Sequence, residues 1–223
     1  MFDPDQPRDR FGRWTDEGGT TTAIHAAAKT VPLNANDPEI IKKSMDQWFN
    51  EDLPKLEEGI DIRRWVNEYT TPFFRDLNYN LYNDNELTPE QKIADEKLGK
   101  LFEVAPKTEG TFYRGMNFSN EAKYKAFKRD LGEDGEIQFK GYMSTTLDRE
   151  VTRRSKFQGD ERIRHRVEFS IKGKNGVYIA GVSTVPDEQE VLFKRGVKLR
   201  VKKMYEKIDA DNNVKLFVEA EEL

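Results

Sequence analysis

The chain has 223 residues, of which 36% are hydrophobic, 35% are charged and 11% are aromatic. This length suits one sizeable domain with an appendage, and the aromatic content argues against a disordered chain. The sequence has no cysteine, which excludes disulfides and thiolate chemistry, and its two histidines poorly supply a zinc site or a Ser-His-Asp triad. The net charge of -4 provides no general attraction to nucleic acid or to an anionic membrane.

The first 36 residues predict a flexible tail. Prolines and glycines punctuate this stretch, and no hydrophobic periodicity runs through it. Its beginning is charged and has no apolar core, so we expect no secretory signal peptide. No apolar run approaches the length of a bilayer span. These features predict a protein of the cytoplasm that does not bind membranes.

The tail contains the segment QPRDRFGRWTDEGG, residues 6–19. This segment resembles a short stretch that recurs in tailed-phage head-morphogenesis and minor head proteins. The resemblance implies a phage or prophage origin, a phage head or portal protein as a partner, and carriage in the virion. A leader that docks nowhere is an equal alternative. We therefore place the catalytic part of the chain at residues 37–223.

A helical half follows the tail. Asp37-Pro38-Glu39 predicts a helix start with Asp37 as the N-cap, and apolar residues then recur at helical spacing as far as Asn50. A second helical pattern covers residues 63–80, and we expect Pro72 to break or kink it. Thr88-Pro89-Glu90-Gln91 repeats the start signal and predicts a third helix through Phe102.

From Gly110 the hydrophobic period changes to two, which indicates strands. We predict a helix over residues 120–131, a turn at Gly173-Lys174-Asn175-Gly176 and a further turn at Asp211-Asn212-Asn213. The expected strands cover residues 111–116, 136–139, 164–171, 176–182, 188–193, 197–204 and 214–218. Helices followed by strands indicate an α+β fold, with helices packed on a largely antiparallel sheet arrangement.

Two acidic residues, Glu188 and Glu190, stand two positions apart at the start of an apolar run. In a strand such residues point to one face, about 7 Å apart. Two neighbouring carboxylates repel each other and are costly to desolvate, so a buried strand rarely carries them without a use. An exposed, charged strand edge is the alternative for this pair taken alone.

Two further motifs accompany the acidic pair. Arg114, followed by Gly115 in FYRGM, offers a planar fork for phosphate oxygens beside bare backbone. Ser144-Thr145-Thr146 in YMSTTL supplies hydroxyls that can hold a ribose. A carboxylate close to a sugar C–N bond stabilises an oxocarbenium-like transition state. Together the motifs suggest cleavage of a phosphorylated N-glycoside such as NAD, with no metal.

Residues 37–204 resemble the mono-ADP-ribosyltransferases with an Arg–Ser–Glu signature, which include binary-toxin enzymatic subunits and phage-encoded transferases. The resemblance implies N-terminal helices packed on a mainly antiparallel two-sheet core. It makes Glu190, Glu188 and Ser144 the expected catalytic residues. Residues expected to bind NAD are Arg114, Gly115, Thr145, Thr146, the aromatic Phe157 and, in a helical motif, Asn78. In that helical motif the family continues with Leu-Arg, whereas this chain has Leu81-Tyr82.

The first acid of the pair indicates the acceptor. Family members with Glu at this position modify arginine, and those with Gln modify asparagine or nucleic acid. Glu188 therefore favours transfer of ADP-ribose to an arginine of a target protein, and nucleic acid is the less favoured acceptor. NAD glycohydrolysis, ADP-ribosylation of nucleic acid and a non-enzymatic phage-head interaction protein remain the alternatives.

Overall fold

The computed structural model describes residues 31–118, 120–131, 135–153, 165–208 and 213–223. The phage-like segment and Phe157 therefore lie outside the described residues. The described chain forms one folded unit that starts at Val31, earlier than the expected boundary at residue 37. The short strand β1, Leu33–Asn34, explains the earlier start because it pairs in parallel with Thr108–Glu109.

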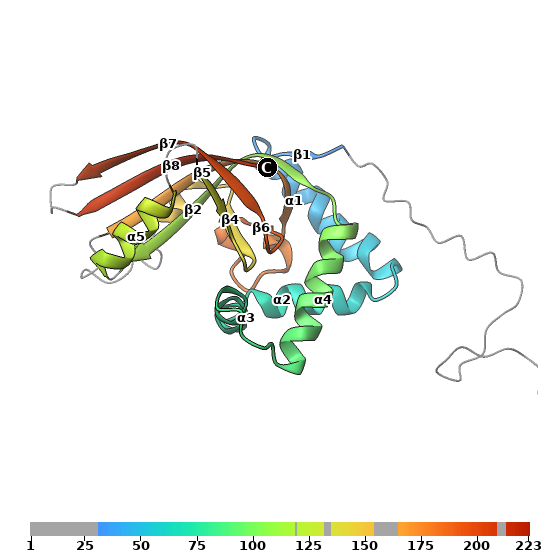
Figure 1. The fold of residues 1–223 in the computed structure, drawn as a ribbon. Helices are drawn as coiled ribbons and strands as arrows, with labels where there is room; N and C mark the ends of the chain where they lie inside the picture. The colour runs from blue at the N-terminus through green and yellow to red at the C-terminus, as the bar shows by residue number, and fades with distance from the viewer. Residues whose placement is uncertain (1–30, 119, 132–134, 154–164, 209–212) are drawn as a thin grey trace, which may run out of the picture. The chain divides into compact units, whose positions relative to one another are not determined.

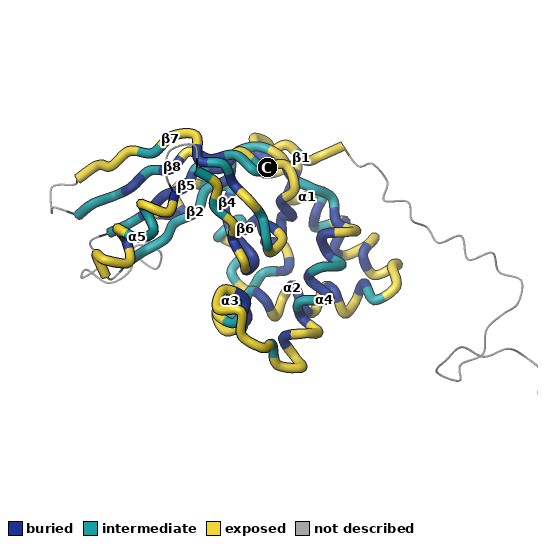
Figure 2. The backbone as a smooth tube through the Cα atoms, viewed as in Figure 1, coloured by how far each residue is buried: buried dark blue, intermediate teal, exposed yellow. Residues whose placement is uncertain are grey.

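Helices fill the first half of this unit, as the sequence predicts. They are α1 (Pro38–Gln47), a π-helical turn η1 (Trp48–Asp52), a 3-10 turn η2 (Leu53–Lys55), α2 (Gly59–Tyr69), α3 (Phe73–Tyr82) and α4 (Pro89–Val104). Figure 1 shows α2, α3 and α4 gathered on one side of strands β4 and β6. Buried residues lie on the sides of α1, α2 and α4 that face inward, as Figure 2 shows.

Local signals set most of the helix boundaries. Pro72 does break the predicted helix, and α2 and α3 are separate helices. Thr88 and Gln91 form a complete capping box at the start of α4. The first helix starts at Pro38 with Asp37 at the N-cap position, as expected, although the Asp37 side chain makes no capping hydrogen bond.

The strands of the described residues form one hydrogen-bonded array in the order β1-β2-β4-β6-β5-β8-β7-β3, and β2 also pairs with β5. All neighbours are antiparallel except β1–β2 and β5–β8. The strands are β2 (Thr108–Phe118), β3 (Glu136–Gln138), β4 (Met143–Thr146), β5 (His165–Tyr178), β6 (Glu190–Phe193), β7 (Lys198–Ile208) and β8 (Val214–Glu222). Helix α5 (Glu121–Leu131) contacts β2 and β3. This is the mainly antiparallel α+β fold that the sequence predicts.

The predicted turn at residues 173–176 is wrong, because β5 runs through it as one long strand. Its two glycines serve close packing: an added Cβ would lie 2.8 Å from the Phe193 ring at Gly173 and 2.5 Å from Val191 Cγ1 at Gly176. The Glu222 carboxylate accepts the backbone N–H groups of Lys174 and Asn175, at 2.7 and 3.1 Å. Sheet pairing and the Glu222 carboxylate thus provide hydrogen-bond partners for the backbone of residues 173–176, a segment whose sequence is typical of a hairpin turn.

No helix in the described part of the chain is long and apolar enough to cross a membrane.

Candidate active site

One cavity of about 350 Å³ gathers the predicted site residues that the structure describes. Its lining residues come from strands β2 and β4, helices α2 and α3, the turn after β4 and the segment that leads into β6. The predicted residues that line it are Asn78, Arg114, Gly115, Ser144, Thr145, Thr146, Glu188 and Glu190. Segments far apart in the sequence thus meet around one cavity.

The local structure of the acidic pair differs from the prediction. Strand β6 begins at Glu190, while Glu188 ends a 3-10 turn, η5 (Pro186–Glu188). Gln189 between them has φ 46° and ψ 47°, in the left-handed region, and its carbonyl accepts the Leu147 N–H at 3.2 Å. Pro186 favours the turn, and the reversal at Gln189 replaces the strand geometry. Both acids still line the cavity, but not as alternate residues of one strand.

Strand β4 sets the hydroxyl groups opposite the second acid. Thr146 is the direct partner of Glu190 across the β4–β6 pair, and Ser144 is the partner of Leu192. The hydroxyl of Thr145 donates to the Val191 carbonyl at 2.7 Å, so it stabilises the strand pair. The Ser144 hydroxyl lies beside the Glu190 carboxylate and lowers its pKa.

Burial shifts the protonation of Glu190. The residue is only 8% exposed, and the resulting loss of hydration raises the pKa of the carboxyl to about 7. Repulsion from Glu188 raises the pKa further, while the Ser144 hydroxyl and the charge of Arg114 oppose the shift. A carboxyl whose pKa lies near neutrality is typical of catalytic sites.

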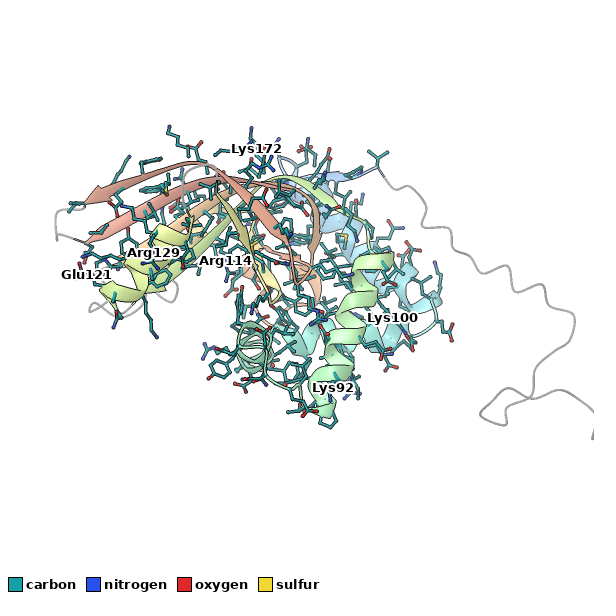
Figure 3. All side chains as sticks on the ribbon, in the orientation of Figure 1. Lys92, Lys100, Arg114, Glu121, Arg129 and Lys172 are labelled. Atoms are coloured by element: carbon teal, nitrogen blue, oxygen red, sulfur yellow. The ribbon has the colours of Figure 1, made fainter. Side chains whose placement is uncertain are left out.

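Arg114 is held so that part of its guanidinium remains available. Its Nη1 donates to the Ser144 carbonyl at 2.6 Å, and its guanidinium carbon lies 5.7 Å from the centre of the Phe139 ring. Its buried Nε has no hydrogen-bond partner among the described residues. In Figure 3 Arg114 lies beneath the sheet and Lys172 above it. A buried donor without a partner beside a cavity fits an anionic ligand such as the pyrophosphate of NAD.

Asn78 connects α3 to β4. Its Nδ2 donates to the Tyr69 hydroxyl at 3.1 Å, and its Oδ1 accepts the Tyr142 N–H at 2.9 Å. An added Cβ at Gly141 would lie 2.4 Å from Asn78 Oδ1, so the glycine lets the asparagine approach. Asn78 therefore lines the cavity while also fixing the backbone just before the serine strand.

Some lining residues have no clear signal in the sequence. Tyr69 reads as part of an aromatic core stripe, yet its hydroxyl lies 3.4 Å from Ser144 Oγ, and burial and the nearby Glu190 charge raise its pKa. Thr152 belongs to the 3-10 turn η3 (Arg149–Arg153), which follows the serine strand and lies against Gly115. The other lining residues outside the predicted set are Thr70, Phe74, Arg75, Tyr113, Tyr142, Val151, Ser183 and Val185.

Solved structures with this fold are ADP-ribosyltransferases. The Vis enzyme of Vibrio splendidus, solved in complex with agmatine, aligns with TM-score 0.61 at 19% identity, covering 85% of this chain and 84% of that one. Exoenzyme S from Pseudomonas aeruginosa, solved with human 14-3-3 protein beta and bound to carba-NAD, aligns with TM-score 0.56 at 22% identity, covering 82% and 88%. The fold is therefore that of the ADP-ribosyltransferase toxins.

The model of the ADP-ribosyltransferase exoenzyme family matches residues 45–223, and the chain belongs to this family. NAD is the substrate of its enzymes. A Mycobacterium avium protein provisionally named NAD(+)–arginine ADP-ribosyltransferase Mav is 29% identical over 198 residues, covering 89% of this chain and 22% of its own length. Secreted exoenzyme S of Pseudomonas aeruginosa is 28% identical over 201 residues, covering 81% and 41%. The chain thus spans less than half the length of these relatives.

Proposed function

We propose that the chain is a mono-ADP-ribosyltransferase that moves ADP-ribose from NAD to an arginine side chain of a target protein and releases nicotinamide. The observation that carries the proposal is the buried Glu190, which lies in one cavity with Glu188, Ser144 and the partly unsatisfied Arg114. These groups match the charges of the reactants: an anionic pyrophosphate, a cationic sugar in the transition state and a cationic acceptor.

In this mechanism the residues act on different parts of NAD. Arg114 binds the phosphate oxygens and fixes the donor. As the C1–N bond breaks, its electron pair leaves with nicotinamide and positive charge develops on the ribose. The Glu190 carboxylate stabilises this charge, and the neighbouring Ser144 hydroxyl orients the carboxylate. The desolvated site strengthens this interaction relative to water.

Glu188 serves the acceptor. A carboxylate complements a planar guanidinium, and it can accept the proton that the attacking nitrogen loses when it bonds to C1. The name of the Mav relative and the agmatine complex of Vis support a guanidinium acceptor, since agmatine carries that group.

The first test is nicotinamide release from NAD with and without agmatine. We expect agmatine to stimulate release by the wild type, and Glu190→Ala to lower release by ~100-fold or more, because a main electrostatic stabiliser is lost. Glu219→Ala, which removes an exposed carboxylate on β8, is the matched control and should retain full activity. Release that ignores agmatine would instead indicate a glycohydrolase or another acceptor.

The acceptor class can be separated with labelled NAD in a lysate. Protease should destroy the labelled product and nuclease should leave it intact. The reverse pattern would establish nucleic acid as the acceptor. Docking of residues 6–19 to a phage head protein, and carriage in a virion, stay predictions, tested by whether binding to such a protein survives Glu190→Ala and is lost on removal of residues 1–36.

A further inference from the structure

The segment that leads to Glu188 is tied to the C-terminal end of α2. The hydroxyl of Thr184 donates to the Thr70 carbonyl at 2.9 Å, and the N–H of Thr184 donates to Thr70 Oγ1 at 2.9 Å. The two hydroxyl oxygens lie 3.2 Å apart. Thr70 is the C-cap of α2, so the end of a packed helix holds the segment through both main chain and side chain.

Asn67, one helical turn earlier, makes a second tie. Its Nδ2 donates to the Val182 carbonyl at 2.8 Å. Residues three apart on a helix lie on one face, so Asn67 and Thr70 can both hydrogen-bond residues 182–184. Helix α2 is itself fixed by buried Trp65, Val66 and Tyr69.

The rest of the segment is closed by its own hydrogen bonds. The Val185 N–H donates to Ser183 Oγ at 3.0 Å, and the Glu188 N–H donates to the Val185 carbonyl at 3.1 Å. The Gln189 N–H then donates to the Pro186 carbonyl at 3.0 Å. Because these hydrogen bonds constrain the backbone between Thr184 and Glu188, a displacement of Thr184 should also displace Glu188.

Glu190 is held independently. It pairs with Thr146 in the β4–β6 ladder, and its carbonyl accepts the Ile179 N–H at 2.9 Å. The two acids of the site are thus positioned by different parts of the fold: Glu190 by the sheet, and Glu188 by the end of α2.

We propose that the Thr70–Thr184 contact is a positioning device that holds Glu188 at the acceptor side of the site. It thereby sets how the enzyme divides NAD between transfer to a guanidinium and hydrolysis. This inference rests on the proposed transferase function and adds a residue, Thr184, that does not itself line the cavity.

The test is Thr184→Val, which removes the hydroxyl and keeps the shape of an exposed side chain. Thr71→Val is the matched control, since the Thr71 hydroxyl donates to the Glu68 carbonyl and accepts the Phe73 N–H, both outside residues 182–188. Two quantities are measured: nicotinamide release without acceptor, and ADP-ribosyl-agmatine formed per nicotinamide released. We expect Thr184→Val to keep the first within ~2-fold and to lower the second by ~10-fold, which corresponds to about 1.4 kcal/mol and is the size expected for loss of one hydrogen bond.

Thr184→Ser should restore the wild-type division, because it regains the hydroxyl. A Thr184→Val enzyme that divides NAD as Thr71→Val does would overturn the inference, and so would one in which hydrolysis and transfer fall in proportion. Separate KM values for agmatine and NAD give a further check: the first should rise and the second should not. A wild type that transfers nothing to agmatine would overturn the proposed function itself, which is a different result.

Discussion

At the scale of single residues, the site depends on a carboxyl that the fold holds near its titration point. Glu190 sits where burial raises its pKa to about 7, and the neighbouring Glu188 adds to the shift. Its ionised form is the one that can stabilise a cationic ribose. The ionised form of the buried Glu190 therefore destabilises the folded protein, but the same carboxylate interacts strongly with the cationic ribose during the reaction.

This arrangement predicts a pH profile. Glu190 must lose its proton to act, so kcat/KM for nicotinamide release should rise with pH to a plateau above about 7 and fall about tenfold per unit below it. The measurement is nicotinamide release at low NAD between pH 5 and 9. Glu188→Gln removes the repulsion and should move the acidic limb to lower pH. A flat profile across pH 6 to 7 would contradict the role assigned to Glu190.

At the scale of elements, the site depends on how α3 meets the start of β4. Asn78 bonds both Tyr69 and the backbone at Tyr142, and Gly141 leaves room for this contact. Similar ties from α2 hold the segment before Glu188. Helices α2 and α3, whose sequences indicate only a role in the core, thus also position the start of β4 and the segment before Glu188.

Substitution of Gly141 by Ala should disturb that junction. The new Cβ would lie 2.4 Å from Asn78 Oδ1 and 3.0 Å from the Tyr82 ring, so we expect a loss of about 1–3 kcal/mol in the free energy of unfolding and a higher KM for NAD. Chemical denaturation and steady-state kinetics measure the two effects. Gly99→Ala is the control: among the described residues, no atom other than the neighbouring backbone of α4 lies within 4 Å of the added Cβ, and helix propensity should stabilise the protein by about 1 kcal/mol. Equal stability of the two variants would refute the steric argument.

At the scale of the whole molecule, the described unit includes residues before the first helix. The Leu33 N–H donates to the Lys107 carbonyl at 2.8 Å, and the Ala35 N–H donates to the Glu109 carbonyl at 2.7 Å. Ala35 is buried against Gly110, where an added Cβ would lie 2.5 Å from the alanine methyl. Strand β1 therefore extends the sheet at the edge of β2, the strand that carries Arg114.

Two truncations test this boundary. A chain that begins at residue 37 loses both hydrogen bonds and the Ala35 contact, so it should be less stable than a chain that begins at Val31 by about 1–3 kcal/mol. Urea unfolding of the two proteins measures the difference. Identical midpoints would show that residues 31–36 add nothing to the fold.

The sequence by itself determined the α+β class, the break at Pro72, the cap at Thr88 and the motifs at Arg114, Ser144 and Glu190. Each of these depends on local properties: hydrophobic period, backbone restriction, hydrogen-bonding ends and side-chain chemistry. Such signals survive in sequence because neighbouring residues decide them.

Only the tertiary structure decided the path of β5 and the geometry of the acidic pair. Gly173 and Gly176 look like a turn, but contacts with Phe193 and Val191 on a distant strand make them packing positions. Gln189 reads as a strand residue, but it is left-handed, and its carbonyl accepts the N–H of Leu147, the residue that follows β4. The link from Thr70 to Thr184 spans two halves of the chain and has no sequence signal. The local sequence at these positions is compatible with more than one backbone conformation. Long-range packing contacts determine which conformation is adopted.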